Sequence, residues 1–340
     1  MTDPAPPDDL EARYGPELVE CKLTMPNMDS LYEQIRSNAR YAKRMAWGDP
    51  GRGRTVAICG AGPSLAAHVA DIGAADDIWA CNSALPYLWD RGVRVTHGFG
   101  IDQGEGMLTD WARPLPVAYY LASSVHPALV RHLRKAKRRL TFFHSYLGIP
   151  DPEGWVAPLN APPGYSHEME LYTGLYGNSV QVGFGLNSVQ RAVCLALFLE
   201  YDRIIVYGAD CACAPDAPPM PPLRTPEYVA WIRAIVMYAD GRTAGIYGDE
   251  SVMAEADIDG RRWHTRPDMV ISARHMLDLC VNYPGRITLV GDTLPNALAA
   301  KGPEFWARMP TLAGVGHLSG FGNAARVHSL AREAADGVQA

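Results

Sequence analysis

The sequence predicts an α/β fold: a Rossmann-like, mostly parallel sheet with helices on both faces, an N-terminal helical arm and an irregular lid. Short apolar runs alternate with helical segments along most of the chain, which is typical of strand–helix units. The runs at residues 55–59 (TVAIC) and 203–207 (RIIVY) are apolar nearly throughout, as expected of strands buried on both faces. Polar residues follow several of these runs, at the edge where such sheets bind ligands.

The order of apolar runs gives the expected elements. Strands are predicted at residues 55–59, 77–81, 95–101, 117–121, 140–144, 203–207 and 287–290. Helices are predicted at residues 28–47, 65–72, 84–91, 127–138, 187–200, 227–239 and 272–282. Residues 148–181 are rich in Pro, Gly and Tyr and lack periodicity, which predicts a long ordered loop.

The chain is expected to have three regions. Residues 1–53 form an N-terminal arm and helix, and residues 54–302 form a Rossmann-like nucleotide-binding catalytic domain. Residues 303–340 form a C-terminal peripheral segment. A lid is predicted at about 211–265, because this stretch is polar and rich in Pro and Gly.

Composition excludes several classes of protein. Apolar residues make up 48% and charged residues 20% of the 340, which is a globular profile. The net charge of -6 argues against a nucleic-acid binder, and the basic cluster at residues 131–139 is interpreted as a solvated helix face. Cys211 and Cys213 lack the spacing of a zinc site, so reduced thiols and a cytoplasmic location are expected. No apolar run is long enough for a membrane span.

The first strand–helix turn carries the motif that points most clearly to a ligand. Gly60 and Gly62 would let the backbone approach a ligand closely, and Pro63 and Ser64 open a helix whose free amides suit a phosphate. The third glycine of a dinucleotide fingerprint is replaced by Leu65, and no Walker lysine follows. The turn therefore predicts a phosphate or nucleotide other than NAD or FAD, with a plain tight turn as the alternative.

Polar residues at three further strand ends are candidate nucleotide ligands. Asn82 can donate and accept hydrogen bonds, while Asp102 and Asp210 could bind a ribose hydroxyl or a cation. Asn187 and Ser188 open a helix after a Gly-rich approach and predict a second anion or sugar contact. Turn formation and helix capping remain the alternative explanations for all of these residues.

His264 is the candidate general base among ten histidines. It lies at the end of the predicted lid, and imidazole suits proton transfer near neutral pH. Arg262 and Arg266 flank it and could stabilise a phosphate. An exposed loop histidine is the alternative.

Four blocks occur in an order that resembles one superfamily. They are residues 58–65 (ICGAGPSL), 79–88 (WACNSALPYL), 186–210 (LNSVQRAVCLALFLEYDRIIVYGAD) and the pair His264-Thr265. The superfamily contains motility accessory factor glycosyltransferases that modify flagellin, and bacterial lipooligosaccharide sialyltransferases that use CMP-sialic acid. It also contains 6-hydroxymethylpterin pyrophosphokinase-like (DUF115) domains. The resemblance covers about residues 54–300.

The resemblance implies roles for the matching residues of the first block and the strand ends. Gly60, Gly62, Pro63 and Ser64 would form the turn that binds the nucleotide phosphate. Asn82 would match an asparagine that contacts the nucleotide, and Asp102 falls where the sialyltransferases have another such asparagine.

The later blocks carry further implied roles. Asn187 and Ser188 would match a Thr-Ser pair beside the sugar nucleotide, and Gly208 would let the nucleotide pack on the strand end. His264 would match the base that deprotonates the acceptor hydroxyl. The tyrosines that support the leaving phosphate in the sialyltransferases are missing after Asp210, where this chain continues with residues 211–215 (CACAP).

These observations lead to three functional hypotheses. The first is a glycosyltransferase that moves a sugar, such as a nonulosonic acid, from a CMP-linked donor to a hydroxyl of a glycan, protein or small molecule. The second is a pyrophosphokinase that uses ATP and Mg²⁺, with Asp102 and Asp210 as metal ligands. The third is a non-catalytic nucleotide-sugar binding module. No cofactor is assigned beyond the Mg²⁺ of the second hypothesis, and the oligomeric state is left open.

Overall fold

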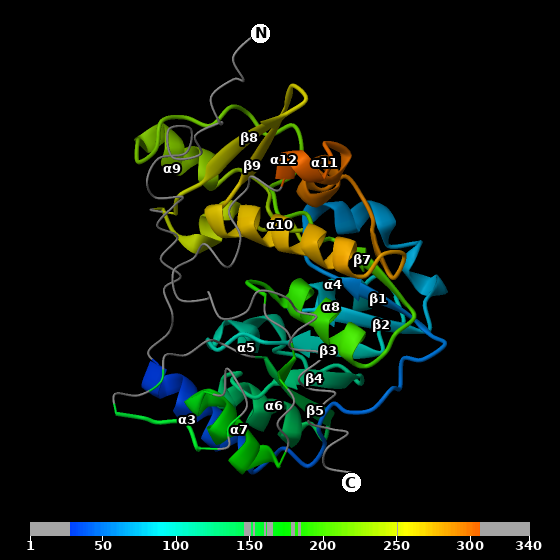
Figure 1. The fold of residues 1–340 in the computed structure, drawn as a ribbon. Coiled ribbons are helices and arrows are strands. Elements are labelled where there is room, and N and C mark those ends of the chain that lie inside the picture. Colours follow the sequence, from blue (N-terminus) through cyan, green and yellow to red (C-terminus); the bar gives the residue numbers. More distant parts are fainter. Residues whose placement is uncertain are drawn as a thin grey trace.

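An eight-stranded parallel sheet forms the centre of the molecule (Figure 1). The computed structural model describes residues 28–145, 151, 154–159, 161, 166–177, 181–182, 185–249 and 251–306. The strand order is β10-β7-β1-β2-β3-β4-β5-β6. The strands are β1 (Thr55–Cys59), β2 (Asp77–Cys81), β3 (His97–Gly100), β4 (Ala118–Ala122), β5 (Arg139–Ser145), β6 (Gln181–Val182), β7 (Arg203–Tyr207) and β10 (Ile287–Leu289).

The strand order reverses at β1, and this reversal positions the site. Strands β2 to β5 follow on one side of β1, whereas β7 and β10 lie on the other. All five residues of β1 pair in parallel with β7, from Thr55 with Arg203 to Cys59 with Tyr207. At the carboxyl edge of an open α/β sheet, such a reversal of strand order is where a ligand crevice forms.

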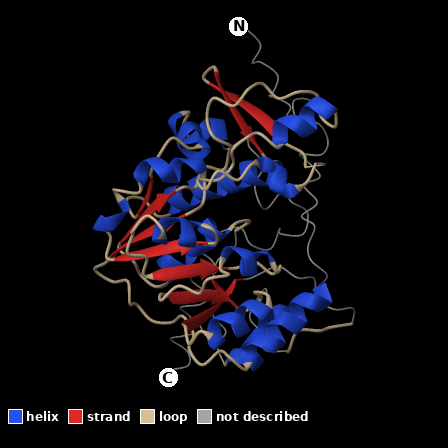
Figure 2. Cartoon of the chain, turned by 180° about the vertical axis from the view of Figure 1, so that it is seen from behind, coloured by secondary structure: helices blue, strands red, loops and turns tan. Residues whose placement is uncertain are grey.

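Helices cover both faces of the sheet, as a comparison of the front and rear views shows (Figures 1 and 2). The α-helices are α3 (Met28–Ala39), α4 (Ala84–Trp89), α5 (Gly106–Asp110), α6 (Pro127–Lys135), α7 (His167–Tyr176), α8 (Ser188–Phe198), α9 (Pro226–Ile232), α10 (Pro267–Asn282), α11 (Leu294–Ala300) and α12 (Pro303–Trp306). The 3₁₀ helices are η1 (Pro63–His68), η2 (Ile72–Ala74) and η3 (Ala244–Tyr247). The predicted α/β fold class is confirmed.

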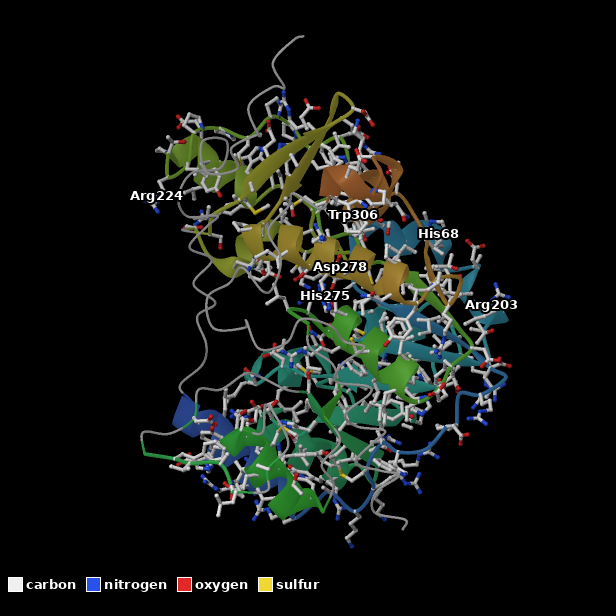
Figure 3. All side chains as sticks on the ribbon, in the orientation of Figure 1. His68, Arg203, Arg224, His275, Asp278 and Trp306 are labelled. Carbon is white, nitrogen blue, oxygen red and sulfur yellow. The ribbon has the colours of Figure 1, made fainter. Side chains whose placement is uncertain are left out.

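A second layer packs above β7 and β10. The antiparallel hairpin β8–β9 (Ala254–Ile258 and Arg261–Thr265) shares a small apolar core with α10, α11 and α12, to which Trp263, Leu277 and Trp306 contribute. Figure 3 shows His275 and Asp278 on α10, the long helix between this layer and the sheet. None of the helices in the described ranges combines the length and apolar character needed to cross a bilayer.

Several sequence predictions need correction. The predicted helix at 65–72 is the 3₁₀ helix Pro63–His68, and the predicted loop at 148–181 contains α7 and β6. The predicted helix at 227–239 ends earlier, as Pro226–Ile232. The predicted lid is not irregular throughout, because it contains α9, η3 and the hairpin β8–β9. Residues 1–27 of the arm and 307–340 of the C-terminal segment lie outside the described residues.

Candidate functional site

A cavity of about 790 Å³ opens at the carboxyl ends of β1, β2, β3 and β7. This volume suits a small-molecule ligand such as a nucleotide. Its other walls are the first turns of α8 and α10 and the segment around Tyr238. The predicted residues that line it are Gly62, Asn82, Asp102, Asn187, Ser188, Gly208, Asp210 and Arg266. These eight residues come from six separate segments of the chain, which meet at one pocket.

The glycines at the strand ends allow two backbone turns to cross closely. A Cβ atom on Gly60 would lie 2.4 Å from the carbonyl oxygen of Gly208, and one on Gly208 would lie 2.4 Å from that of Gly60. Gly208 also has a φ of +62°, which L-residues rarely adopt. Gly60 does not line the pocket, so the need for glycine at this position is explained by the close backbone packing against Gly208.

The amides of the first turn are already engaged by a carboxylate. The backbone N–H of Ser64 donates to Asp210 Oδ1 at 3.1 Å, and the Ser64 hydroxyl donates to Oδ2 at 2.9 Å. A Cβ atom on Gly62 would lie 2.0 Å from the same carboxylate. Pro63 and Ser64 do not line the pocket. The hydrogen-bond donors of Ser64, which were predicted to bind a phosphate, therefore already bind the Asp210 carboxylate.

Asp210 is the buried acid of the pocket. Its side chain is 4% exposed, and burial raises its pKa to about 6 against the opposing hydrogen bonds from Ser64. Each carboxylate oxygen keeps a lone pair beyond those that Ser64 uses. Asp210 can therefore gain or lose a proton close to neutral pH.

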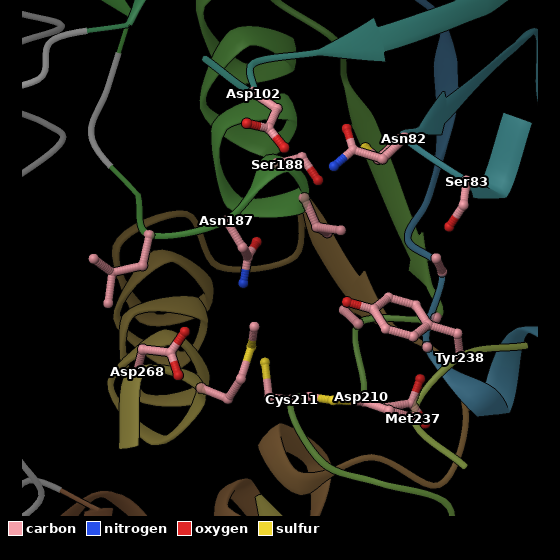
Figure 4. Close-up of a pocket in the computed structure, with 18 of the residues that line it drawn as sticks. Asn82, Ser83, Asp102, Asn187, Ser188, Asp210, Cys211, Met237, Tyr238 and Asp268 are labelled. Atoms are coloured by element: carbon pink, nitrogen blue, oxygen red, sulfur yellow. The ribbon is translucent and has the colours of Figure 1, made fainter. Parts of the chain in front are cut away.

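Asn82, Asp102 and Ser188 converge on one side of the pocket (Figure 4). Asn82 has a φ of 47°, and its Oδ1 atom is buried without a hydrogen-bond partner among the described residues. Asp102 is exposed, with Oδ1 accepting the N–H of Gly104 at 2.8 Å. A buried amide oxygen without a partner at a pocket wall needs a donor, which an ordered water or a ligand can supply.

Helix α8 begins at the pocket with a complete capping box. Asn187 Oδ1 accepts the N–H of Gln190 at 3.0 Å, and Gln190 Oε1 accepts the N–H groups of Leu186 and Asn187. Asn187 thus has the capping role that was its alternative explanation, and it also lines the cavity. One turn later, Arg191 lies on the same helical face and also lines the cavity. Arg191 was not among the site residues predicted from the sequence.

An aromatic and cationic wall faces Asn82 and Ser188. The hydroxyl groups of Tyr238 and Tyr247 share a hydrogen bond, and the Arg266 guanidinium lies 3.7 Å from the centre of the Tyr247 ring. Arg266 also pairs with Asp268 at 3.0 Å, and Arg242 pairs with Asp110 at 3.2 Å. The tyrosines expected after Asp210 are absent there, but Tyr238 and Tyr247 reach the pocket from a segment with no such motif.

His264 and Arg262 lie outside the pocket lining, contrary to expectation. The His264 side chain is buried on β9, where Nε2 lies 3.1 Å from Glu255 Oε2 and the ring meets Trp231 edge-on at 5.0 Å. Burial lowers the pKa of His264, while Glu255 acts in the opposite direction. Arg262 is exposed and pairs with Glu255 at 3.2 Å. The alternative of an exposed loop histidine is wrong, because His264 is buried in strand β9.

The pocket carboxylates fit one mode of Mg²⁺ binding. Within the described ranges, no three His, Cys, Asp or Glu side chains cluster in a way that could hold a metal alone. Asp102 and Asp210 nevertheless line the same cavity. Mg²⁺ commonly binds through one or two carboxylates together with substrate phosphates and water, which requires no larger protein cage.

Comparisons with known proteins agree with this fold. The structure of the MAf glycosyltransferase from Magnetospirillum magneticum AMB-1 matches with a TM-score of 0.50 at 12% identity, over 83% of this chain and 41% of that chain. The likeness concerns the fold, and this chain spans less than half of that protein's length. No curated protein matches the sequence. The model of one family, described as 6-hydroxymethylpterin diphosphokinase MptE-like, matches residues 25–216. That match covers more than half of the chain, which therefore belongs to the 6-hydroxymethylpterin diphosphokinase MptE-like family.

Proposed function

We propose that this protein is a transferase of the glycosyltransferase type, which holds a nucleotide-activated sugar in the pocket and transfers the sugar to an acceptor hydroxyl. One observation carries the proposal: most of the nucleotide-binding residues predicted from separate sequence blocks line a single cavity. Its place at the reversal of strand order is the usual place for such a ligand. The glycosyltransferase fold of the structural match supports the same reaction class.

The proposed donor is CMP-linked, with a nonulosonic acid as the sugar. The resemblance of residues 79–88 and 186–210 to a superfamily that includes CMP-sialic acid-dependent sialyltransferases supports this choice. Asn82 and Ser188 would orient the nucleotide from one wall. Tyr238 and Arg266 would face it from the other wall. The acceptor would be the hydroxyl of a glycan, a protein or a small molecule.

The proposed reaction breaks the bond between the sugar's anomeric carbon and the phosphate oxygen and forms a bond to the acceptor oxygen. Asp210 would accept the acceptor's proton, because it is the buried pocket acid whose pKa is about 6. Arg266 would stabilise the negative charge that develops on the leaving phosphate. His264 remains the rival base, and it would have to act from outside the pocket lining.

A diphosphokinase is the second candidate, and the family match favours it. In this case the pocket would bind ATP, and Asp102 and Asp210 would hold Mg²⁺ together with the phosphates. Bound Mg²⁺ would offset the charge that develops on the phosphoryl oxygens. The acceptor would be the hydroxymethyl group of a pterin or a similar alcohol.

A thermal-shift panel separates the candidates. CMP, CDP, UDP, GDP and ATP are each tested with and without Mg²⁺, because a ligand of the native state raises the unfolding temperature. Stabilisation by CMP without Mg²⁺ supports the glycosyltransferase, whereas stabilisation by ATP only with Mg²⁺ supports the diphosphokinase. Nucleotide binding without turnover of any donor indicates the non-catalytic module. No stabilisation by any nucleotide would end the proposal.

A further inference from the structure

Arg191 is a buried cation at the edge of the pocket, and one of its donor groups has no partner among the residues that the structure describes. Its side chain is 8% exposed, and Nε donates to the carbonyl of Gly185 at 2.7 Å. The Nη1 atom is buried and has no hydrogen-bond partner among the described residues. An unsatisfied donor on a buried charge is costly, so its place beside a cavity indicates a missing partner.

The charge of Arg191 is retained at neutral pH. Burial lowers its pKa to about 10, and the nearby Glu168 carboxylate acts in the opposite direction. No ion pair joins the Arg191 guanidinium to a carboxylate within the part of the chain that the structure describes. The pocket arginines 242 and 266 differ in this respect, because each is held by a neighbouring aspartate.

The first turn of α8 adds backbone donors next to Arg191. The capping box uses the N–H groups of Leu186, Asn187 and Gln190. In the described contacts it leaves the N–H groups of Ser188 and Val189 without an acceptor, and both residues line the cavity. The turn after β1 offers no equivalent place, because Asp210 already accepts from Ser64.

We propose that Arg191 is an anion-binding residue of the pocket, which holds a phosphate or carboxylate group of the substrate at the start of α8. This inference rests on the proposed function and deepens it, because it moves the anion from the first glycine turn to α8. Arg191 lies one helical turn beyond Asn187. Its planar guanidinium group and the free N–H groups of Ser188 and Val189 can therefore contact the same anion. The positively charged end of the α8 dipole favours the same anion.

The test measures the binding of four probes by isothermal titration calorimetry. The probes are pyrophosphate, CMP, free sialic acid and cytidine, and the proteins are wild type, Arg191→Met and Arg131→Met. We expect Arg191→Met to weaken the binding of at least one anionic probe by about tenfold or more, because it removes a charged hydrogen bond. Cytidine binding stays unchanged. Arg131 is exposed on α6 and is not part of the pocket lining, so Arg131→Met controls for the loss of one cation.

The probes also distinguish the source of the anion and the failure of each idea. Weaker binding of pyrophosphate and CMP indicates a phosphate, whereas weaker binding of sialic acid alone indicates a carboxylate. If Arg191→Met binds the anionic probes as tightly as the wild type does, the inference is overturned. It is also overturned if the affinity for cytidine falls as much as the affinity for CMP. Neither result affects the proposed function. If pyrophosphate binding depends on Arg191 but the protein transfers no sugar, the inference stands and the proposed function is wrong. Wild-type protein that binds none of the probes ends both.

A second variant keeps the test decisive if Arg191→Met does not fold. Arg191→Lys retains the charge but loses the planar fork that matches phosphate and carboxylate. We expect its anion affinity to fall several-fold while its unfolding temperature stays near that of the wild type. Unchanged affinity in this variant likewise overturns the inference.

Discussion

Replacing Asp210 with asparagine should make the protein more stable at neutral pH, and the gain should depend on pH. Burial raises the pKa of Asp210 from 3.8 to about 6. The folded state therefore binds this proton more tightly than the unfolded chain, and stability falls as the pH rises from about 4 to above 6. A shift of this size corresponds to roughly 3 kcal/mol at pH 8, of which roughly 2 kcal/mol develops between pH 4.5 and pH 8.

The asparagine removes the ionisation while keeping the shape and the contact with Ser64. Its oxygen can accept the Ser64 N–H, and its NH₂ group can donate to the Ser64 hydroxyl oxygen. We expect the free energy of unfolding of Asp210→Asn, relative to wild type, to rise by about 2 kcal/mol between pH 4.5 and pH 8. The measurement is urea denaturation at several pH values.

Asp202→Asn, at an exposed position before β7, controls for the loss of one carboxylate. A stability difference between Asp210→Asn and wild type that does not change with pH would refute the reasoning. A higher free energy of unfolding for the wild type than for Asp210→Asn at pH 8 would also refute the reasoning. The same variant should lose transfer activity while still binding nucleotide, because the proposed proton acceptor is gone.

Three further substitutions test other parts of the site. Gly208→Ala should lower the free energy of unfolding by about 2 kcal/mol or more in urea denaturation, since its Cβ would meet the Gly60 carbonyl and its φ is positive. Gly241→Ala shares the positive φ but has open space, so a loss as large there would contradict the packing explanation. Asn187→Ala should cost about 1 kcal/mol in the same assay through loss of the α8 cap, and an unchanged stability would argue against the capping box. His264→Gln should keep kcat within about tenfold of wild type, whereas a loss of about 10²-fold or more with nucleotide still bound would reinstate His264 as the base.

The sheet could be predicted because buried parallel strands carry a strong local signal. The predicted ranges 55–59, 77–81 and 203–207 match β1, β2 and β7. Strand β6 has two residues and no pattern of its own, so only its pairing with β5 defines it. The hairpin β8–β9 has a local sequence signal that was not used in the prediction. Asp259 and Gly260 form an Asp-Gly turn with φ values of 56° and 75°, the conformation of a tight hairpin.

The site could be predicted where it consists of strand ends and helix starts. Asn82, Asp102 and Ser188 occupy positions that the topology alone brings to the carboxyl edge. The engagement of Ser64 by Asp210 joins residues from two different strand ends, and no local pattern indicates it. His264 was misplaced because its partner Glu255 lies across a hairpin that had been interpreted as an irregular lid. Arg191 could have been found from its helical spacing to Asn187.

The most direct test of nucleotide binding in this pocket is the affinity of CMP for Asn82→Asp. Aspartate tolerates the positive φ of Asn82 and has the same shape, but it adds a negative charge at a pocket wall. We predict that CMP binds to wild type at least about tenfold more tightly than to the variant, whose folded state is checked without ligand by its cooperative thermal unfolding. Equal CMP affinity in the two proteins would show that the nucleotide binds elsewhere or not at all.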